Sequence, residues 1–168
     1  MGRTRVTWVG KSMHIRSVEK KDCLDLWKWR NDYKAVASSI SKSVVPYLSH
    51  SRWFNSLINK TDAEIFIAYD GKEKKNIGMV RFEKKNGKVI EVSININPHF
   101  RGKGLGREFL SRSIATFTER KPGFVIKARV LVENHRSKRL FKSCGFVVSS
   151  IRDKIVYYTL KKGNNVDK

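Results

Sequence analysis

The stretch that decides the fold runs from residue 89 to residue 106 and reads VIEVSININPHFRGKGLG. Its first half alternates between apolar and polar side chains, which is the pattern of a β-strand with two unlike faces. Pro98 ends this strand, and three glycines then follow within residues 102–106. Beyond them, residues 105–120 carry apolar side chains at helical spacing. The stretch therefore predicts a strand, a glycine-rich loop and the start of a helix, in that order.

The glycine-rich loop has the properties of a phosphate-binding site. Glycine lets the backbone approach a ligand closely, and a helix N-terminus presents unpaired N–H groups and the positive end of its dipole. Arg101 and Lys103 add formal charge. The loop lacks the Gly-Lys-Ser/Thr of a Walker motif, and it reads GxGxG after four predicted strands instead of GxGxxG in an early βαβ unit. The alternative is a flexible, charged turn between strand and helix.

The strand before this loop has one polar face. A central strand with helices on both sides is normally apolar on both faces. A polar face thus indicates either an edge strand or a wet cavity beneath the sheet, and the adjoining glycine loop favours the cavity. The apolar face consists of Ile90, Val92, Ile94 and Ile96, and the polar face consists of Glu91, Ser93, Asn95 and Asn97.

Outward from this centre, the same patterns predict one mixed α/β (α+β) domain at residues 13–162. We expect about six or seven strands flanked by about four helices, with residues 1–12 as an N-terminal extension and residues 163–168 as a frayed tail. Residues 38–47 are predicted to be a loop. The expected helices begin at the caps Asp22, Ser49 and Asn134 and at Leu105, and the expected strands are 14–18, 65–69, 77–82, 89–97, 124–132, 146–151 and 154–160.

The composition narrows the class of protein. There are 36 Lys and Arg against 15 Asp and Glu, a net charge of +21, which attracts anionic partners. The two cysteines, Cys23 and Cys144, have neither CxxC nor metal-ligand spacing, so we expect no metal site and a reducing cytoplasmic location. The chain contains no apolar run of about 18 residues, so no membrane span is predicted.

Two motifs resemble the GNAT superfamily of N-acetyltransferases. Residues 97–106 are similar to its (Q/R)xxGx(G/A) acetyl-CoA signature, and residues 134–146 are similar to its second motif, N-x-x-(A/S)-x-x-L-Y-x-x-x-G-F. The resemblance covers residues 13–161 and implies a GNAT fold and acetyl transfer from acetyl-CoA (coenzyme A) to a primary amine. It implies that coenzyme A is held by Ile94, Ile96, Arg101, Gly102, Lys103, Gly104, Leu105, Gly106, Asn134 and Ser137.

The reaction needs a base, because a protonated amine is not a nucleophile. Glu91 is the first candidate, since it is a carboxylate on the polar face of the strand at residues 89–97. Similar members of the GNAT superfamily carry a glutamate at this position. Its alternative role is an ion-pair partner for a basic residue, and Glu133 is the reserve base. The family's usual tyrosine acid is replaced by Phe141, which leaves Tyr157, Tyr158, Cys144 or an unassisted thiolate.

The N-terminal half, which usually shapes the acceptor site in this superfamily, resembles a narrower subgroup of it. Residues 29–31 (WRN) and 50–54 (HxxWF) are similar to acetyltransferases of nucleotide-linked amino sugars in the pseudaminic acid pathway, a pattern shared with RimJ/RimL-like N-terminal acetyltransferases of ribosomal proteins. This resemblance implies that Arg30, His50 and Trp53 bind the acceptor, although aromatics at helical spacing are more often core. Two other readings stay open: acetylation of a protein N-terminus, and a basic RNA- or ribosome-binding module on the same scaffold. Exposed C-terminal strands also permit a homodimer.

Overall fold

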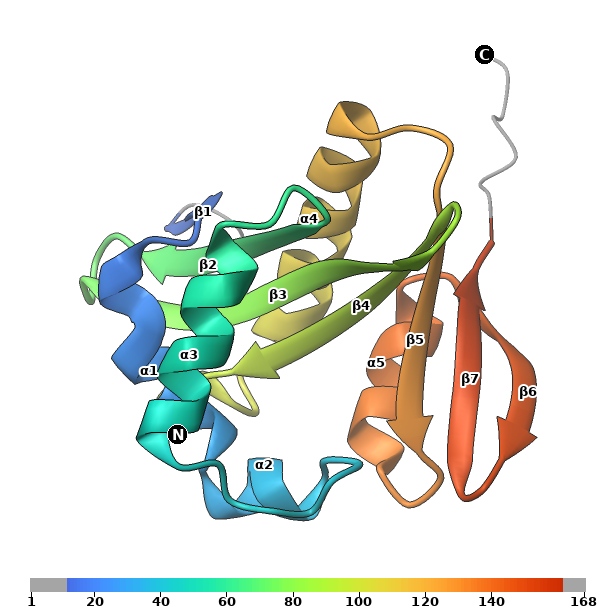
Figure 1. Cartoon of the computed structure of the whole chain (residues 1–168), viewed down its shortest axis with the longest axis horizontal. Coiled ribbons are helices and arrows are strands. Elements are labelled where there is room, and N and C mark those ends of the chain that lie inside the picture. Colours follow the sequence, from blue (N-terminus) through green and yellow to red (C-terminus); the bar gives the residue numbers. More distant parts are fainter. Residues whose placement is uncertain (1–11, 162–168) are drawn as a thin grey trace, which may run out of the picture.

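The alternating segments form a single mixed sheet in the computed structural model, which describes residues 12–161. The seven strands lie in the order β1-β2-β3-β4-β5-β7-β6, and only β4 and β5 run parallel to each other. Figure 1 shows this sheet and the helices around it. The strands are β1 (Met13–Ser17), β2 (Ala63–Asp70), β3 (Lys75–Asn86), β4 (Val89–Ile96), β5 (Val125–Leu131), β6 (Phe146–Arg152) and β7 (Ile155–Leu160).

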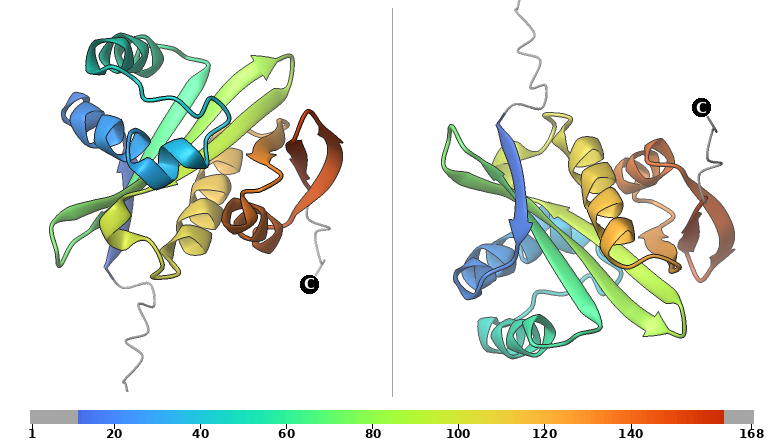
Figure 2. Two further views of the ribbon diagram at one scale, coloured as in Figure 1. Left: turned by 90° about the horizontal axis from the view of Figure 1, so that it is seen from below. Right: turned by 90° about the horizontal axis from the view of Figure 1, so that it is seen from above.

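The described residues form five α-helices, and four of them cover the two faces of the sheet (Figure 2). They are α1 (Cys23–Arg30), α2 (Tyr33–Ala37), α3 (Tyr47–Ile58), α4 (Leu105–Arg120) and α5 (His135–Ser143). Helices α1 and α3 pack on one face, and α4 and α5 pack on the other. Two short 3-10 turns, Lys20–Asp22 and Pro98–Phe100, precede α1 and the glycine-rich loop.

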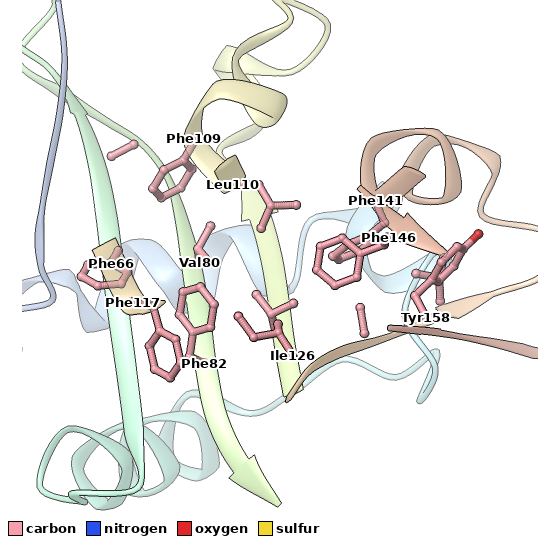
Figure 3. Close-up of a cluster of buried hydrophobic side chains, with 14 of the residues drawn as sticks. Phe66, Val80, Phe82, Phe109, Leu110, Phe117, Ile126, Phe141, Phe146 and Tyr158 are labelled. Carbon is pink, nitrogen blue, oxygen red and sulfur yellow. The ribbon is translucent and has the colours of Figure 1, made fainter. Parts of the chain in front are cut away.

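The main core lies between the sheet and α4 with α5 (Figure 3). Phe82 of β3 and Phe117 of α4 stack with ring centroids 4.3 Å apart. At the other end of the core, Phe141 of α5 meets Phe146 of β6 edge to face. A smaller cluster fills the opposite face, where Leu26 and Phe54 join α1 and α3 to β2. Apolar side chains buried at these densities supply most of the folding free energy.

The predicted fold class is confirmed: it is a mixed α/β sheet flanked by helices. Strand β4 is the fourth of seven, so the edge-strand explanation of its polar face is excluded. Gly145 follows α5 with φ of 88°, as predicted for a glycine that ends a helix in the left-handed conformation. The hairpin predicted at Asn86 and Gly87 is also present, between β3 and β4.

One local prediction is wrong, one holds in position only, and one helix was missed. Ser49 does not cap α3, because that helix already begins at Tyr47 with Pro46 before it. Asp22 does occupy the N-cap position of α1, as predicted, but its carboxylate accepts from Arg16 and the Glu19 amide and makes no capping hydrogen bond to α1. Helix α2 was not predicted at all; Asp32 caps it by accepting from the amides of Lys34 and Ala35.

Strands β1 and β6 are the two edges of the sheet. On β6, Val147, Val148 and Ile151 are exposed, and this is where the predicted pairing of subunits would occur. Among the described residues, no helix is long and apolar enough to cross a membrane.

Gly78 should be indispensable to the β3–β4 pairing. A Cβ atom at this position would lie 2.6 Å from the carbonyl oxygen of Asn95 on β4. Since backbone cannot yield as a side chain does, we expect Gly78→Ala to lower the free energy of unfolding by about 1–3 kcal/mol in chemical denaturation. Gly71→Ala is the matched control, because its Cβ would meet the exposed His14 ring at 3.3 Å and backbone only at the ordinary contact distance of 3.8 Å. An equal loss in both variants would contradict this prediction.

Candidate active site

A wedge opens in the middle of the sheet where β4 and β5 separate. Their parallel pairing extends only from Val89 with Val125 to Glu91 with Lys127. Beyond that point β4 stays paired with β3, whereas β5 pairs with β7. Figure 1 shows the two strands diverging toward their C-terminal ends. Residues 92–96 therefore present one backbone edge to the wedge, which a ligand with amide groups can use as an added strand would.

The glycine-rich loop lies at the open end of the wedge and leads directly into α4. Gly102 and Gly104 have φ of 80° and 77°, and a Cβ atom at either position would meet nothing within 4 Å. Glycine is thus required here by backbone conformation, and the space above the loop is open. The N-cap of α4 is Gly104, which has no side chain to occupy the first amides of this 16-residue helix. An anion can bind those amides and the dipole behind them.

The remaining residues predicted to hold coenzyme A surround this loop. The Arg101 Nε donates to the carbonyl of Ile96 at 2.9 Å, so this side chain braces the loop against the end of β4. Lys103 Nζ lies 4.8 Å from the ring centroid of Phe100. Leu105 is buried and anchors α4, while Gly106 packs near Leu140 of α5.

Across the wedge, Asn134 caps α5 by accepting from the amide of Ser137 at 3.1 Å. Its amide nitrogen donates to the carbonyl of Ser38 at 3.3 Å. Ile94 and Ile96 turn their side chains toward the core under α4, which leaves their backbone as the part nearest the wedge. The residues predicted for the cofactor therefore gather around one opening.

Glu91 stands at the apex of the wedge, where the β4–β5 pairing ends. Its two carboxylate oxygens accept from Arg129 Nε at 2.6 Å and Nη2 at 2.9 Å. This bidentate ion pair joins β4 to β5 on the polar face of the sheet. The carboxylate raises the pKa of Arg129 mainly through that hydrogen bond. Each oxygen of Glu91 keeps a second lone pair, so the ion pair leaves room for a further hydrogen-bond donor.

The structure also places the candidate acids. Phe141 is buried in the core against Phe146 and Tyr158, and it has no hydroxyl group. Burial raises the pKa of Tyr158, which is 1% exposed on the α4–α5 face. Tyr157 instead pairs in register with Arg129, on the face that carries Glu91. Cys144 is half-buried near Ser111 of α4.

Of the three residues predicted to bind the acceptor, two lie close together between α1 and α3. His50 is 4% exposed, and its Nε2 has no hydrogen-bond partner among the described residues. Arg30 Nη2 donates to Ser41 Oγ at 2.7 Å, while its buried Nη1 has no partner within residues 12–161. Trp53 is half-buried, with the guanidinium carbon of Arg81 5.3 Å from its ring centroid. These assignments stay predictions.

Arg81, Arg129 and Asp32 were not singled out from the sequence. Arg81 lies on the polar face of β3, and its Nε is buried without a partner in the part of the chain that the structure describes. Burial lowers the pKa of this guanidinium, against the charges of Glu83 and Glu91. Alternation along β3 would have placed Arg81 on the same face as Glu83, but the pairing of β3 with β4 was needed to bring it opposite Ser93.

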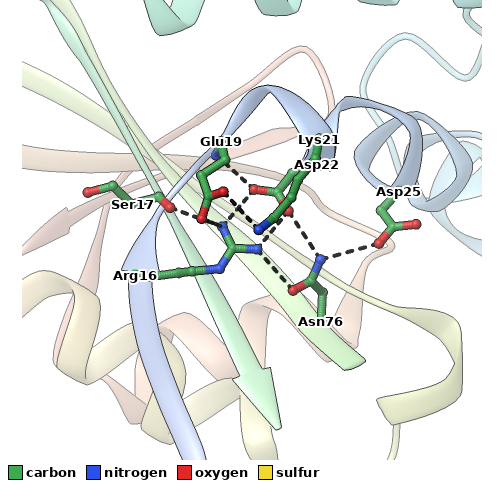
Figure 4. A network of polar contacts seen from close by, with 7 residues as sticks. All are labelled: Arg16, Ser17, Glu19, Lys21, Asp22, Asp25 and Asn76. Carbon is green, nitrogen blue, oxygen red and sulfur yellow. Dashed lines mark hydrogen bonds and ion pairs between the residues drawn. The ribbon is translucent and has the colours of Figure 1, made fainter. Parts of the chain in front are cut away.

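A hollow of about 780 Å³ lies beside β1 and the start of β3, and it is lined by both acids and bases. Figure 4 shows the network that forms its wall. Arg16 binds both oxygens of Asp22 at 2.7 Å, and Asn76 bridges Asp22 and Asp25 at 3.2 Å. Burial would raise the pKa of Asp22, but hydrogen bonds from Arg16 and the Glu19 amide lower it on balance. These charges satisfy one another, so we assign the network to anchoring β1 and α1.

Within residues 12–161, no group of three or more His, Cys, Asp or Glu side chains is placed to hold a metal ion.

Comparisons with known proteins agree with this geometry. A family model described as an acetyltransferase (GNAT) domain matches residues 13–147. A spermidine N-acetyltransferase from Vibrio cholerae, solved with CoA and spermine, has a TM-score of 0.77 at 20% identity, over 89% of this chain and 94% of that one. A domain from Methanocaldococcus jannaschii gives 0.76 at 23% identity, over 89% and 99%. A GNAT-family acetyltransferase from Bacillus anthracis gives 0.75 at 19%, over 89% and 95%. Comparison with curated protein sequences gives no match.

His50 predicts a pH dependence of stability. Burial lowers its pKa below the ordinary 6.5, a hydrogen bond with the Cys23 backbone opposes this, and the charge of Arg30 lowers it further. The stabilisation by neutral His50 is therefore fully present above the unfolded pKa and is lost as the pH falls toward the lower folded value. Between about pH 7 and pH 5, urea titrations should show wild type losing stability faster than His50→Phe. Parallel curves for the two proteins would refute this.

Proposed function

This chain is a member of the GNAT acetyltransferase family, and from that premise we propose that it acetylates the primary amine of a nucleotide-linked amino sugar. The cofactor of the family's reaction is acetyl-CoA. The observation that supports the acetyl-transfer part of the proposal is the wedge between β4 and β5, with the glycine-rich loop and the N-terminus of α4 at its open end. A pyrophosphate with an amide-containing arm is a ligand of that shape.

The residues present fit acetyl-CoA on two independent grounds. The left-handed glycines and uncapped amides of α4 suit the pyrophosphate, because a Cβ atom would project into the open space above the loop. The backbone edge of residues 92–96 suits the amides of the pantetheine arm. When bound there, acetyl-CoA supplies the thioester whose carbonyl carbon the amine attacks.

We assign the proton from the attacking amine to Glu91. Its carboxylate lies at the apex of the wedge, and Arg129 holds it in one orientation. The amine must lose this proton as its nitrogen forms the new bond to carbon and the bond from carbon to sulfur breaks. Phe141 has no hydroxyl group to protonate a sulfur leaving group, so the positive field of the loop and α4 would stabilise a coenzyme A thiolate there. Tyr157, on the face that carries Glu91, is the alternative proton donor.

The acceptor assignment rests on charge and on the face that carries Glu91. A net charge of +21 repels polycations and attracts a nucleotide diphosphate. The half-buried guanidinium of Arg81 lies beside the ring of Trp53, and the two together suit an anionic group and an adjoining ring. Spermidine, the substrate named for the Vibrio cholerae enzyme, lacks any group that such a donor would bind.

Gly104→Asn should abolish most of the affinity for coenzyme A. Asparagine tolerates a φ of 77°, so the loop keeps its conformation, but the added side chain fills the space in which phosphate would bind. Loss of one hydrogen bond to a charged group corresponds to at least about tenfold in Kd, measured by isothermal titration with desulfo-CoA at two salt concentrations.

Gly123→Asn is the matched control, because Gly123 also has a positive φ and open space around it but lies in the turn after α4. Equal affinity in both variants would contradict the assignment of the loop. Failure of the wild-type chain to bind coenzyme A would remove the basis for an acetyltransferase, and RNA binding would then be tested.

Glu91→Gln should reduce kcat by about a hundredfold or more and leave the Kd for desulfo-CoA unchanged, because a general base contributes roughly 10²–10⁴. The deficit should shrink as pH rises, since more of the acceptor amine is then already deprotonated. Assays would offer a UDP-linked amino sugar, spermidine and a peptide N-terminus as separate acceptors.

Glu64→Gln is the control, since Glu64 on β2 is similarly buried and pairs with Arg120 at 2.7 Å, remote from the wedge. If Arg129→Gln lowers kcat as much as Glu91→Gln does, with the same pH profile, the ion pair has only a structural role in joining β4 to β5. Faster turnover of spermidine or the peptide than of the sugar would overturn the acceptor assignment alone.

A further inference from the structure

We propose that Asp32 is a positioning residue that transmits occupancy of the glycine-rich loop to a strap across the mouth of the wedge. The strap is residues 33–45, which comprise α2 and the segment that leads toward α3. The inference rests on the proposed function, because it takes coenzyme A as the ligand of the loop. It adds a coupling between the cofactor site and the part of the chain that closes over it.

Arg101 is the joint on the cofactor side. Its Nε donates to the carbonyl of Ile96, and its Nη1 donates to the Asp32 carboxylate in a short ion pair. Its own backbone begins the loop immediately before Gly102. One side chain therefore ties together the end of β4, the start of the loop and the start of α2.

The strap also contacts the β5 side of the wedge, through residues 38 and 42. The carbonyl of Ser38 accepts from Asn134 at 3.3 Å, and Lys42 Nζ lies 2.5 Å from Glu133. Glu133 and Asn134 lie two and three residues after the end of β5, and Arg101 lies five residues after the end of β4. The strap thus bridges the two strand ends between which the wedge opens, and Figure 1 shows α2 on that side of the molecule.

The two ion pairs that attach the strap differ in strength. Lys42 and Glu133 are 54% and 62% exposed, so water and salt screen their interaction. Arg101 and Asp32 are only 14% and 17% exposed. Slight burial would raise the pKa of Asp32, but hydrogen bonds from Arg101 and the Ala35 amide lower it on balance. The carboxylate is therefore ionised at neutral pH, and the better shielded of these two ion pairs is the one to the cofactor loop. The C-terminal end of the strap is held separately, because Trp27 and Asn31 donate to the Val45 carbonyl and the Val45 amide donates to Asn31 Oδ1.

Asp32 also caps α2, and the two roles can be separated by mutation. Its Oδ2 accepts from the amides of Lys34 and Ala35 at 3.1 and 3.2 Å. Asparagine is as good a cap as aspartate but carries no charge, so Asp32→Asn keeps α2 and weakens the tether. Asp32→Ala removes both the cap and the tether. Glu64→Gln again provides the loss of a similarly buried ion-paired carboxylate elsewhere.

The test is hydrogen exchange of the full chain, followed by mass spectrometry, with and without saturating CoA. In wild type and Glu64→Gln, we expect CoA to slow exchange by about tenfold or more in both the loop, residues 102–107, and the strap, residues 33–45. In Asp32→Asn the loop should still be protected, while the strap should lose most of its protection on CoA binding. Asp32→Ala should expose the strap in both states.

The outcomes separate this inference from the proposed function. Protection of the loop without protection of the strap in wild type would overturn the coupling and leave the cofactor site intact. Strap protection that persists in Asp32→Asn would assign the coupling to another contact and overturn the role of Asp32. Absence of CoA binding in wild type would overturn both proposals. With an active acceptor, Asp32→Asn should raise the acceptor KM several-fold while the Kd for CoA changes little.

Discussion

The site depends on one limit in the sheet: β4 and β5 pair over only three registers before they separate. Parallel strands require a crossover, and here the crossover is α4, which begins at the C-terminal end of β4. The separation, the glycine-rich loop and the helix N-terminus are therefore placed together by the connectivity. If the two strands had paired along their whole length, the backbone groups of residues 92–96 would be hydrogen-bonded to β5. No free backbone edge would then remain for a ligand.

Ion pairs stand at both ends of the opening that this separation creates. Glu91 with Arg129 closes the apex, where backbone hydrogen bonds between β4 and β5 stop. Asp32 with Arg101 braces the mouth, where β4 gives way to the loop. Both pairs are largely shielded on the carboxylate side, so they hold geometry better than the many exposed pairs of this basic chain. A wedge left to the backbone alone would have nothing to fix its width.

Short-range patterns predicted the elements that define the site, and long-range pairing accounts for what was missed. Alternation identified the two faces of β4, and local caps identified Asn134 and Gly145, because each depends on neighbours within a few residues. The partner of Glu91 is 38 residues away, and the partner of Arg101 is 69 residues away. Helix α2 has only five residues, too few for an apolar period, so Asp32 was its sole signal.

A shared fold does not determine the acceptor. The resemblance to polyamine acetyltransferases holds at about one residue in five, which shows the fold alone. In the function that we propose, selection of the amine falls to the face of the sheet that carries Arg81 and Arg129. There Arg81 lies beside the ring of Trp53, and Arg129 pairs with Glu91. The charge of these groups, and not the shared fold, is therefore the basis on which we propose an anionic acceptor.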